Sequence, residues 1–185
     1  MENELIGYIE KWRNKSAGGS ARDNQLESDV FWNNLYNKVL NNEDWKEFFG
    51  ISSLQLIYRV HVGMSEPDKK EYEESGEMEL YPRDMLAFEE YSKKKIDYNN
   101  HWASFTKNVE VIGSSYFGSK QMRGAVVIMK PEKYIDISLI TNGMGFPEDE
   151  VVAPMNIGNV VEELPFEQFM SKYGQGTSDF EKYSR

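Results

Sequence analysis

The 185-residue chain contains no cysteine, and this absence excludes several classes of protein at once. Disulfide scaffolds, zinc fingers, iron–sulfur proteins and thiol enzymes all require that residue. Histidine is also scarce, with two residues in the chain, so a catalytic zinc site lacks most of its usual ligands. A chain of this length buries about 70% of its surface on folding, so it can form a core without covalent or metal staples.

Long apolar runs, an excess of positive charge and nucleotide-binding glycine motifs are missing as well. No stretch approaches the roughly 20 apolar residues of a membrane-spanning helix, and residues 1–5 have no feature of a secretory signal. We therefore expect a cytoplasmic protein with no membrane partner. The 21 basic and 31 acidic residues give a net charge of −10, which opposes binding to nucleic-acid phosphates. Without a Gly-X-Gly-X-X-Gly motif or a P-loop, a Rossmann or kinase-like function has no support.

Apolar residues are spaced as in helices near the N-terminus and as in strands farther along. Phe31, Leu35 and Val39 recur every fourth residue, which predicts packing helices in residues 1–50. Apolar and polar residues alternate over residues 54–62, which predicts a strand. Further strands are expected in five segments: Trp102–Thr106, Ala125–Lys130, Tyr134–Ile140, Glu148–Ala153 and Asn159–Glu163.

The segments between these strands are expected to be helical or irregular. Charged residues dominate 66–95, which predicts a solvated helix, and a further helix is expected over 108–117. Because helices and strands are segregated along the chain, the expected fold class is α+β. The expected organisation is a single domain over residues 1–185, with a helical layer at 1–50, a β-rich core at 54–165 and a flexible polar tail at 174–185.

Three short segments place polar residues on predicted strands. They are Ile57-Tyr58-Arg59, Ala103-Ser104-Phe105-Thr106, and Glu148-Asp149-Glu150 followed by an apolar run. In this order they resemble the arginine–serine–glutamate class of mono-ADP-ribosyltransferases, over residues 54–165. The resemblance implies a pair of packed β-sheets around a cleft for NAD, which is a substrate, and no metal. It also implies transfer of ADP-ribose to a protein, with an arginine side chain as the expected acceptor.

Arg59 is the first candidate for binding NAD. A planar guanidinium donates two parallel hydrogen bonds to phosphate or ribose oxygens, and it keeps its charge when desolvated. The resemblance gives it a catalytic role as well. The alternative is a structural ion pair with one of the many carboxylates of the chain, and the residue alone leaves both interpretations open.

Ser104 and Thr106 lie two residues apart on one predicted strand, so their hydroxyls point to the same face. There we expect them to order Arg59, Glu150 and the nicotinamide ribose. The sequence departs from the family's Ser-Thr-Ser motif, because Phe105 replaces the threonine and Thr106 the final serine. We carry Ser104 over as a catalytic and NAD-binding residue and Thr106 as a further NAD contact, with two ordinary strand hydroxyls as the alternative.

Glu148 and Glu150 are the most informative pair, because strand alternation predicts both carboxylates on one face. A carboxylate beside the ribose stabilises the positive charge that develops as nicotinamide leaves. We assign this catalytic and NAD-binding role to Glu150. By the resemblance, Glu148 faces the acceptor and orients it. The alternative is an acidic, solvated loop, as is common in a protein of this charge.

The segment before this pair, residues 141–147, contains two glycines and a proline and is predicted to be a turn. In the family the corresponding loop recognises the acceptor protein, which makes Met144 and Phe146 candidate acceptor contacts. Their alternative role is to cover the sheet edge.

The expected function is therefore that of a mono-ADP-ribosyltransferase, compatible with a bacterial or phage effector that modifies host proteins. One alternative is an NAD glycohydrolase, in which water is the acceptor. The other is a non-catalytic acidic binding or immunity protein, which the charge of −10 and the altered Ser-Phe-Thr motif permit.

Overall fold

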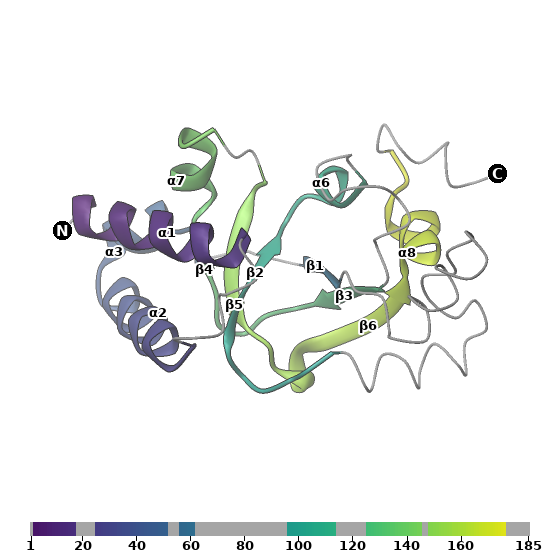
Figure 1. Cartoon of the computed structure of the whole chain (residues 1–185), viewed down its shortest axis with the longest axis horizontal. Helices are drawn as coiled ribbons and strands as arrows, with labels where there is room; N and C mark the ends of the chain where they lie inside the picture. Colours follow the sequence, from purple (N-terminus) through teal and green to yellow (C-terminus); the bar gives the residue numbers. More distant parts are fainter. Residues whose placement is uncertain are drawn as a thin grey trace, which may run out of the picture.

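The chain places its N-terminal helices and its strands in separate regions of the fold. The structure, a computed structural model, describes residues 2–17, 25–51, 56–61, 96–113, 125–145 and 148–176. Within these ranges α1 (Glu2–Ala17), α2 (Gln25–Leu40) and α3 (Glu43–Phe48) precede the first strand. Figure 1 shows the three helices gathered at one end of the molecule, beside the sheet. The predicted α+β class and the helical N-terminal layer are confirmed.

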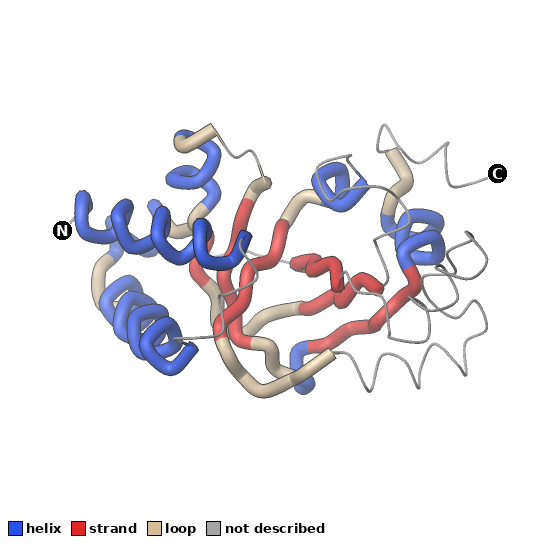
Figure 2. Tube along the Cα trace, viewed as in Figure 1, coloured by secondary structure: helices blue, strands red, loops and turns tan. Residues whose placement is uncertain are grey.

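Within the described parts of the chain, six strands form one open antiparallel sheet. In the spatial order β4-β5-β2-β1-β3-β6 they are β4 (Ile135–Asp136), β5 (Glu150–Pro154), β2 (Trp102–Thr106), β1 (Ile57–His61), β3 (Ala125–Met129) and β6 (Val160–Pro165). The prediction of two packed sheets is wrong for the described residues, because β1 and β2 are joined at the register pair Tyr58–Thr106. Figure 2 shows the two groups of three strands running in different directions from this join.

Residues 134–140 differ most from the predicted strands. β4 ends at Asp136, and α7 (Ser138–Gly143) follows almost at once. Oδ1 of Asp136 accepts hydrogen bonds from the backbone N–H of Ser138, at 3.0 Å, and from its hydroxyl, at 2.6 Å. A carboxylate that satisfies a free N–H group favours the start of a helix, so this contact overrides the strand-like spacing of the isoleucines.

α8 (Phe166–Tyr173) is a helix that the sequence analysis did not predict, although its residues are spaced for one. Phe166, Phe169, Met170 and Tyr173 lie at i, i+3, i+4 and i+7, which places them on one face. The first three are buried against β1 and β3. Figure 1 shows α8 and α6 (Val109–Gly113) beside one group of strands, and α7 with the N-terminal helices beside the other. A short 3-10 helix, η3 (Ile157–Asn159), precedes β6.

The N-terminal helices cover β2, β4 and β5 mainly through aromatic side chains. Trp32 of α2 is fully buried, and its ring lies 5.2 Å from that of Trp12 and 6.2 Å from that of Trp102 on β2, measured between centroids. A second cluster, which includes Ile57 and Phe105, is centred on β1, β2, β3 and β5. Removal of a buried aromatic side chain costs about 3–5 kcal/mol. This packing therefore fixes the position of β2.

α3 is also tied to the sheet, at its C-terminal end. α3 lies in the region of residues 1–50 that was predicted to be helical, and the Asn42 side chain accepts a hydrogen bond from Trp45 N–H at 3.2 Å. Gly50 follows with φ of 57°, and a Cβ there would lie 3.2 Å from Oδ2 of Asp136. Glycine is required here both for this backbone conformation and for the close approach to β4.

Some expected features lie outside the described residues, namely the charged segment 66–95, the part of the predicted helix 108–117 beyond Gly113, and the tail beyond Gly176. Among the helices that the structure does describe, none combines the length and the apolar content needed to cross a membrane.

Candidate active site

Hydrogen bonds through Ser104 link three of the predicted site residues where β1, β2 and β5 lie side by side. Nη1 of Arg59 donates a hydrogen bond to the backbone carbonyl of Ser104 at 2.6 Å. The Ser104 hydroxyl donates to Oε1 of Glu150, also at 2.6 Å. A guanidinium, a hydroxyl and a carboxylate from three separate motifs are thus linked through one serine. We call Arg59, Ser104 and Glu150 the strand-junction site.

The register of β2 and β5 explains the contact between Ser104 and Glu150. Thr106 is paired with Glu150, and Ser104 with Val152, so Ser104 and Glu150 are diagonal neighbours on the same face. The Ser104 carbonyl accepts from the Arg59 side chain just beyond the Tyr58–Thr106 pair, where β1 and β2 join. Strand alternation places Arg59 on the opposite face of β1 from Tyr58, and its guanidinium reaches the Ser104 backbone carbonyl where β1 and β2 join.

Burial sets the electrostatics of the strand-junction site. Glu150 is 3% exposed, whereas Arg59 and Ser104 are half-buried. Acidic residues are almost never fully buried unless they are paired, because a charge removed from water loses its hydration. Here the Ser104 hydroxyl donates a hydrogen bond to Glu150, and the Ser104 carbonyl accepts one from the guanidinium of Arg59. A desolvated carboxylate that shares a hydrogen-bonding residue with an arginine is a candidate functional group.

Thr106, predicted to contact NAD, uses its hydroxyl within the protein. The hydroxyl donates to the carbonyl of Glu148 at 2.6 Å and accepts from the N–H of Asn108 at 3.0 Å. The residue is 3% exposed. It therefore fixes the backbone on both sides of the site, and a contact with NAD stays a prediction.

Glu148 lies before β5 rather than in it. The residue between the two glutamates, Asp149, has φ of 48°, in the left-handed region, and β5 begins at Glu150. The alternation that predicts both carboxylates on one face therefore does not extend to Glu148. The half-buried Glu148 is held instead through its carbonyl by Thr106.

Asp149 was not a predicted site residue, yet both oxygens of its carboxylate accept hydrogen bonds near the strand-junction site. Its carboxylate accepts hydrogen bonds from Nδ2 of Asn108 at 2.8 Å and from Nδ2 of Asn142 at 2.9 Å. The Asn142 side chain lowers the pKa of Asp149, partial burial opposes this, and Asn108 and Lys107 lower it further. The left-handed conformation destabilises a residue other than glycine by roughly 1–2 kcal/mol, whereas each hydrogen bond to a charged group stabilises the fold by about 1.5–3 kcal/mol.

Lys107 forms a second polar link that sequence reasoning missed. Its Nζ lies 2.6 Å from Oδ2 of Asp136 and 2.9 Å from the hydroxyl of Ser138. The end of β2 is therefore attached to the N-terminal end of α7. The partners are far apart in sequence and follow no motif, so no sequence signal could have found them.

The predicted acceptor loop is in part helical. α7 extends to Gly143, and the N–H of Met144 donates to the carbonyls of Ile140 and Thr141 at 3.2 and 3.1 Å. Met144 is half-buried at this helix end. Phe146, the other candidate acceptor contact, lies outside the described residues.

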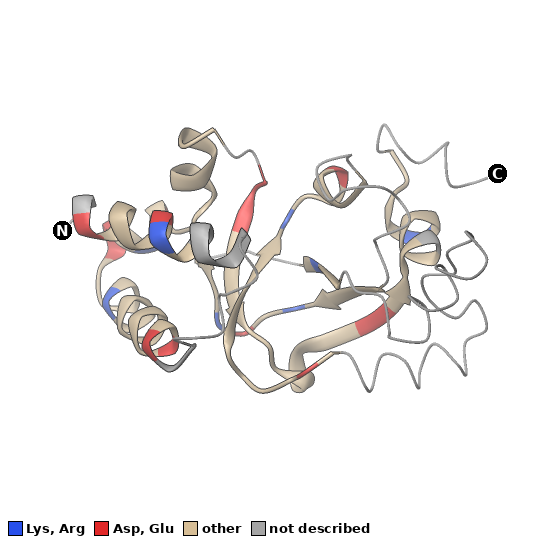
Figure 3. Cartoon of the chain, in the orientation of Figure 1, with Lys and Arg blue, Asp and Glu red and all other residues tan. Residues whose placement is uncertain are grey.

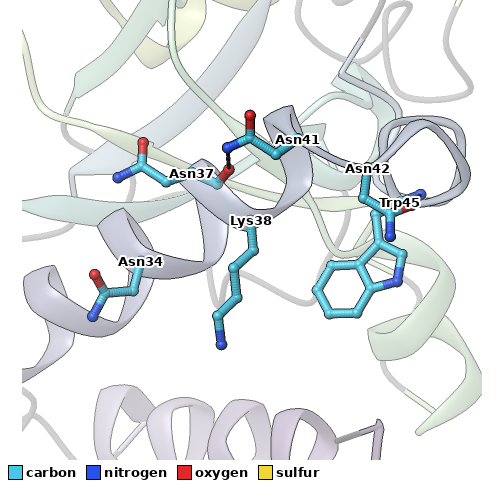
Figure 4. A pocket seen from close by; sticks show the side chains of 6 residues that line it. All are labelled: Asn34, Asn37, Lys38, Asn41, Asn42 and Trp45. Carbon is cyan, nitrogen blue, oxygen red and sulfur yellow. Dashed lines mark hydrogen bonds between the residues drawn. The ribbon is translucent and has the colours of Figure 1, made fainter.

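An open hollow of about 610 Å³ lies on the N-terminal helices, as Figure 4 shows. Its lining residues are Asn34, Asn37, Lys38, Asn41, Asn42 and Trp45. All of them precede the first strand, so the hollow is not part of the strand-junction site. The Asn41 amide donates to the carbonyl of Asn37 at 2.8 Å, and Asn42 caps α3, so these two amides serve the helices.

Comparison of the chain with models of protein families, with characterised proteins and with solved structures gives no match. The function must therefore be argued from the residues of the strand-junction site and their geometry.

Proposed function

We propose that the protein is a mono-ADP-ribosyltransferase that cleaves NAD at the strand-junction site. The observation that carries this proposal is the pair of contacts from Arg59 to Ser104 and from Ser104 to Glu150. Each of the three motifs alone carries little information about function, but the resemblance assigns all three to one reaction. Their residues lie on neighbouring strands. Structural pairing of Arg59 with any of the chain's many carboxylates would not require this combination.

Each group suits one part of NAD. The Arg59 guanidinium is half-buried and charged, which favours the NAD diphosphate as its partner. Ser104 holds Glu150 in one orientation. Glu150 lies at the nicotinamide ribose, where a buried carboxylate stabilises positive charge more strongly than it would in water. Thr106 acts as a positioning residue through the Glu148 carbonyl.

The proposed reaction is a substitution at C1′ of the ribose. The bond from C1′ to the nicotinamide nitrogen breaks, and its electron pair leaves with neutral nicotinamide. A nitrogen of the acceptor, an arginine guanidinium by the resemblance, loses a proton to the Glu148 carboxylate and forms the new bond to C1′. Glu148 passes that proton to solvent. No metal takes part in these steps.

The proposed fold assignment follows from the same residues. We infer an ADP-ribosyltransferase-like arrangement in which the join between β1 and β2 opens a binding cleft for NAD. We propose that the acceptor is a protein of the host and that this chain is a bacterial or phage effector. Met144 and Phe146 are the proposed contacts with that acceptor.

Nicotinamide release and label transfer test the proposal together. The protein is incubated with NAD labelled in the adenylate phosphate, a bacterial lysate and polyarginine. We expect labelled protein and free nicotinamide, and we expect Glu150→Ala to lose both while its far-UV circular dichroism is unchanged. Free ADP-ribose without a labelled macromolecule would identify the glycohydrolase instead. No release of nicotinamide would contradict the proposal and leave the non-catalytic acidic binding protein.

A further inference from the structure

The left-handed turn between the two glutamates connects three parts of the fold. Asp149 accepts hydrogen bonds from Asn108, which follows β2, and from Asn142, near the end of α7. The Asn142 side chain also accepts from the Asp149 N–H at 3.4 Å, and the Asp149 carbonyl accepts from the N–H of Lys107 at 3.2 Å. We call Asp149, Asn108 and Asn142 the Asp149 clamp.

The clamp supports Glu148 far more than Glu150. Glu150 is held without it, by the strand pairing with Thr106 and by the Ser104 hydroxyl. Glu148 lies outside the strand, where the Thr106 hydroxyl donates a hydrogen bond to its carbonyl. The position of Glu148 therefore depends on the conformation of the next residue, Asp149.

The clamp also fixes the C-terminal end of α7. Lys107 already holds the N-terminal end of that helix through Asp136 and Ser138. With Asn142 held by Asp149, both ends of α7 are attached to the segment that follows β2 and to the start of β5. Glu148 and α7, which carries the proposed acceptor contact Met144 at its end, thus form one unit.

We propose that Asp149 is a positioning residue. It determines what fraction of the ADP-ribose from cleaved NAD is transferred to the acceptor rather than to water. This inference rests on the proposed function, in which Glu150 serves cleavage and Glu148 serves the acceptor. Loss of the clamp releases Glu148 and α7 and leaves Glu150 in place. Water then replaces the acceptor at C1′ more often.

The test is the ratio of ADP-ribose on the acceptor to nicotinamide released, measured on whichever acceptor the wild type labels, polyarginine or lysate protein. D149N keeps the size of the side chain and its tolerance of the left-handed region. We expect the ratio to fall about tenfold, as for loss of one hydrogen bond to a charged group, with nicotinamide release changed less than about twofold. D97N is the matched control, because Asp97 also accepts from an asparagine, Asn99, at 3.0 Å, but on the exposed surface.

The double variant D149N/N142D separates a positioning role from a general loss of structure. N142D alone sets two carboxylates against each other, and we expect its ratio to fall at least as far as that of D149N. The double variant returns a carboxylate–amide pair to the same contact, so the ratio should recover in part. N108A and N142A, which leave Asp149 in place, carry the test if D149N does not fold.

The outcomes distinguish failure of this inference from failure of the proposed function. A wild type that releases no nicotinamide overturns both. A wild type that releases nicotinamide but labels nothing overturns the inference and the transferase activity together, and leaves the NAD-cleaving site intact. A ratio that is unchanged in the clamp variants, or a loss of transfer and cleavage by equal factors, overturns the inference alone.

Discussion

Two groups of carboxylates in this acidic protein, one at the start of a strand and one within a strand, have different surroundings. One is at the start of β5, Glu148 to Glu150, and the other is on β6, Glu162 and Glu163. Figure 3 shows both as acidic segments of the same sheet. The first group contacts a serine and two asparagines next to an arginine, whereas the second contacts a lysine and two tyrosines.

The β6 group is explained by packing alone. Glu162 accepts from Lys172 at 2.7 Å and from the Tyr173 hydroxyl, so it attaches α8 to the sheet. Burial raises the pKa of Glu162, but the hydrogen bonds from Lys172 and Tyr173 outweigh it and leave the pKa lowered. Glu163 accepts from the Tyr98 hydroxyl in the same way. These acids have complete partners in the fold and require no ligand to account for them.

The β5 group differs because its buried acid, Glu150, accepts from the hydroxyl of Ser104, whose carbonyl accepts from half-buried Arg59. Net charge therefore does not separate the two groups, but the chemistry of the partners and the burial do. Glu150 is 3% exposed and is linked through Ser104 to half-buried Arg59. If this difference reflects their roles, changes in the β5 group should lower activity, and changes in the β6 group should lower stability alone.

The largest expected effect is that of Glu150→Gln. This change keeps the shape of the side chain and removes the charge that stabilises the ribosyl cation, so nicotinamide release should fall about a thousandfold. Steady-state kinetics of nicotinamide release measures it. The control is Glu162→Gln on β6, for which we expect activity within about twofold of the wild type. Equal losses in both variants would remove the distinction between the two groups.

Arg59→Lys should have the next largest effect. Lysine keeps the positive charge but loses the planar, two-pronged donor and the contact with the Ser104 carbonyl. We expect kcat/KM for NAD to fall about 10- to 100-fold, since one or two hydrogen bonds to a charged group are lost. An unchanged kcat/KM would show that Arg59 has a structural role, like Lys172 beside Glu162.

The acid side of the stability curve should depend on Asp149. Its pKa in the folded protein lies below the ordinary 3.8, so its charge stabilises the fold above pH 3.8, and this contribution is lost as the pH falls through the lowered value. We expect Asp149→Asn to unfold with a weaker pH dependence below pH 3.8, as measured by urea unfolding at several pH values. A pH dependence equal to that of the wild type would contradict the charged clamp.

The smallest expected effect is in the β6 group. Burial raises the pKa of Tyr98 above its ordinary 10.0, and its hydrogen bond to Glu163 raises it further. The protonated phenol therefore stabilises the fold below pH 10, and this contribution is lost as the pH rises above it. Tyr98→Phe should cost about 1 kcal/mol at neutral pH and leave nicotinamide release unchanged. Loss of activity in this variant would assign the β6 group to function.

The sequence was sufficient to predict the parts of the site that depend on local patterns. The order of three motifs led to Arg59, Ser104 and Glu150, and strand alternation predicts the face that Ser104 shares with Thr106. The same reasoning failed for Glu148. A single left-handed residue, Asp149, interrupts the alternation, and the amides that stabilise it come from positions 108 and 142.

The errors in the fold have similar causes. The spacing of Phe166, Phe169 and Met170 is typical of a helix, so the sequence does contain the signal for α8. α7 could not be predicted, because the side chain of Asp136 decides between strand and helix there. The single sheet depends on the pairing of Tyr58 with Thr106, which no local pattern of either strand specifies.

The most direct test of the strand-junction site is a crystal structure of the protein with a nonhydrolysable NAD analogue. We predict that the nicotinamide ribose lies within hydrogen-bond distance of Glu150 and that the diphosphate contacts Arg59. An analogue bound instead in the hollow lined by Asn34, Lys38 and Trp45, or a protein that binds none of it, would contradict the account.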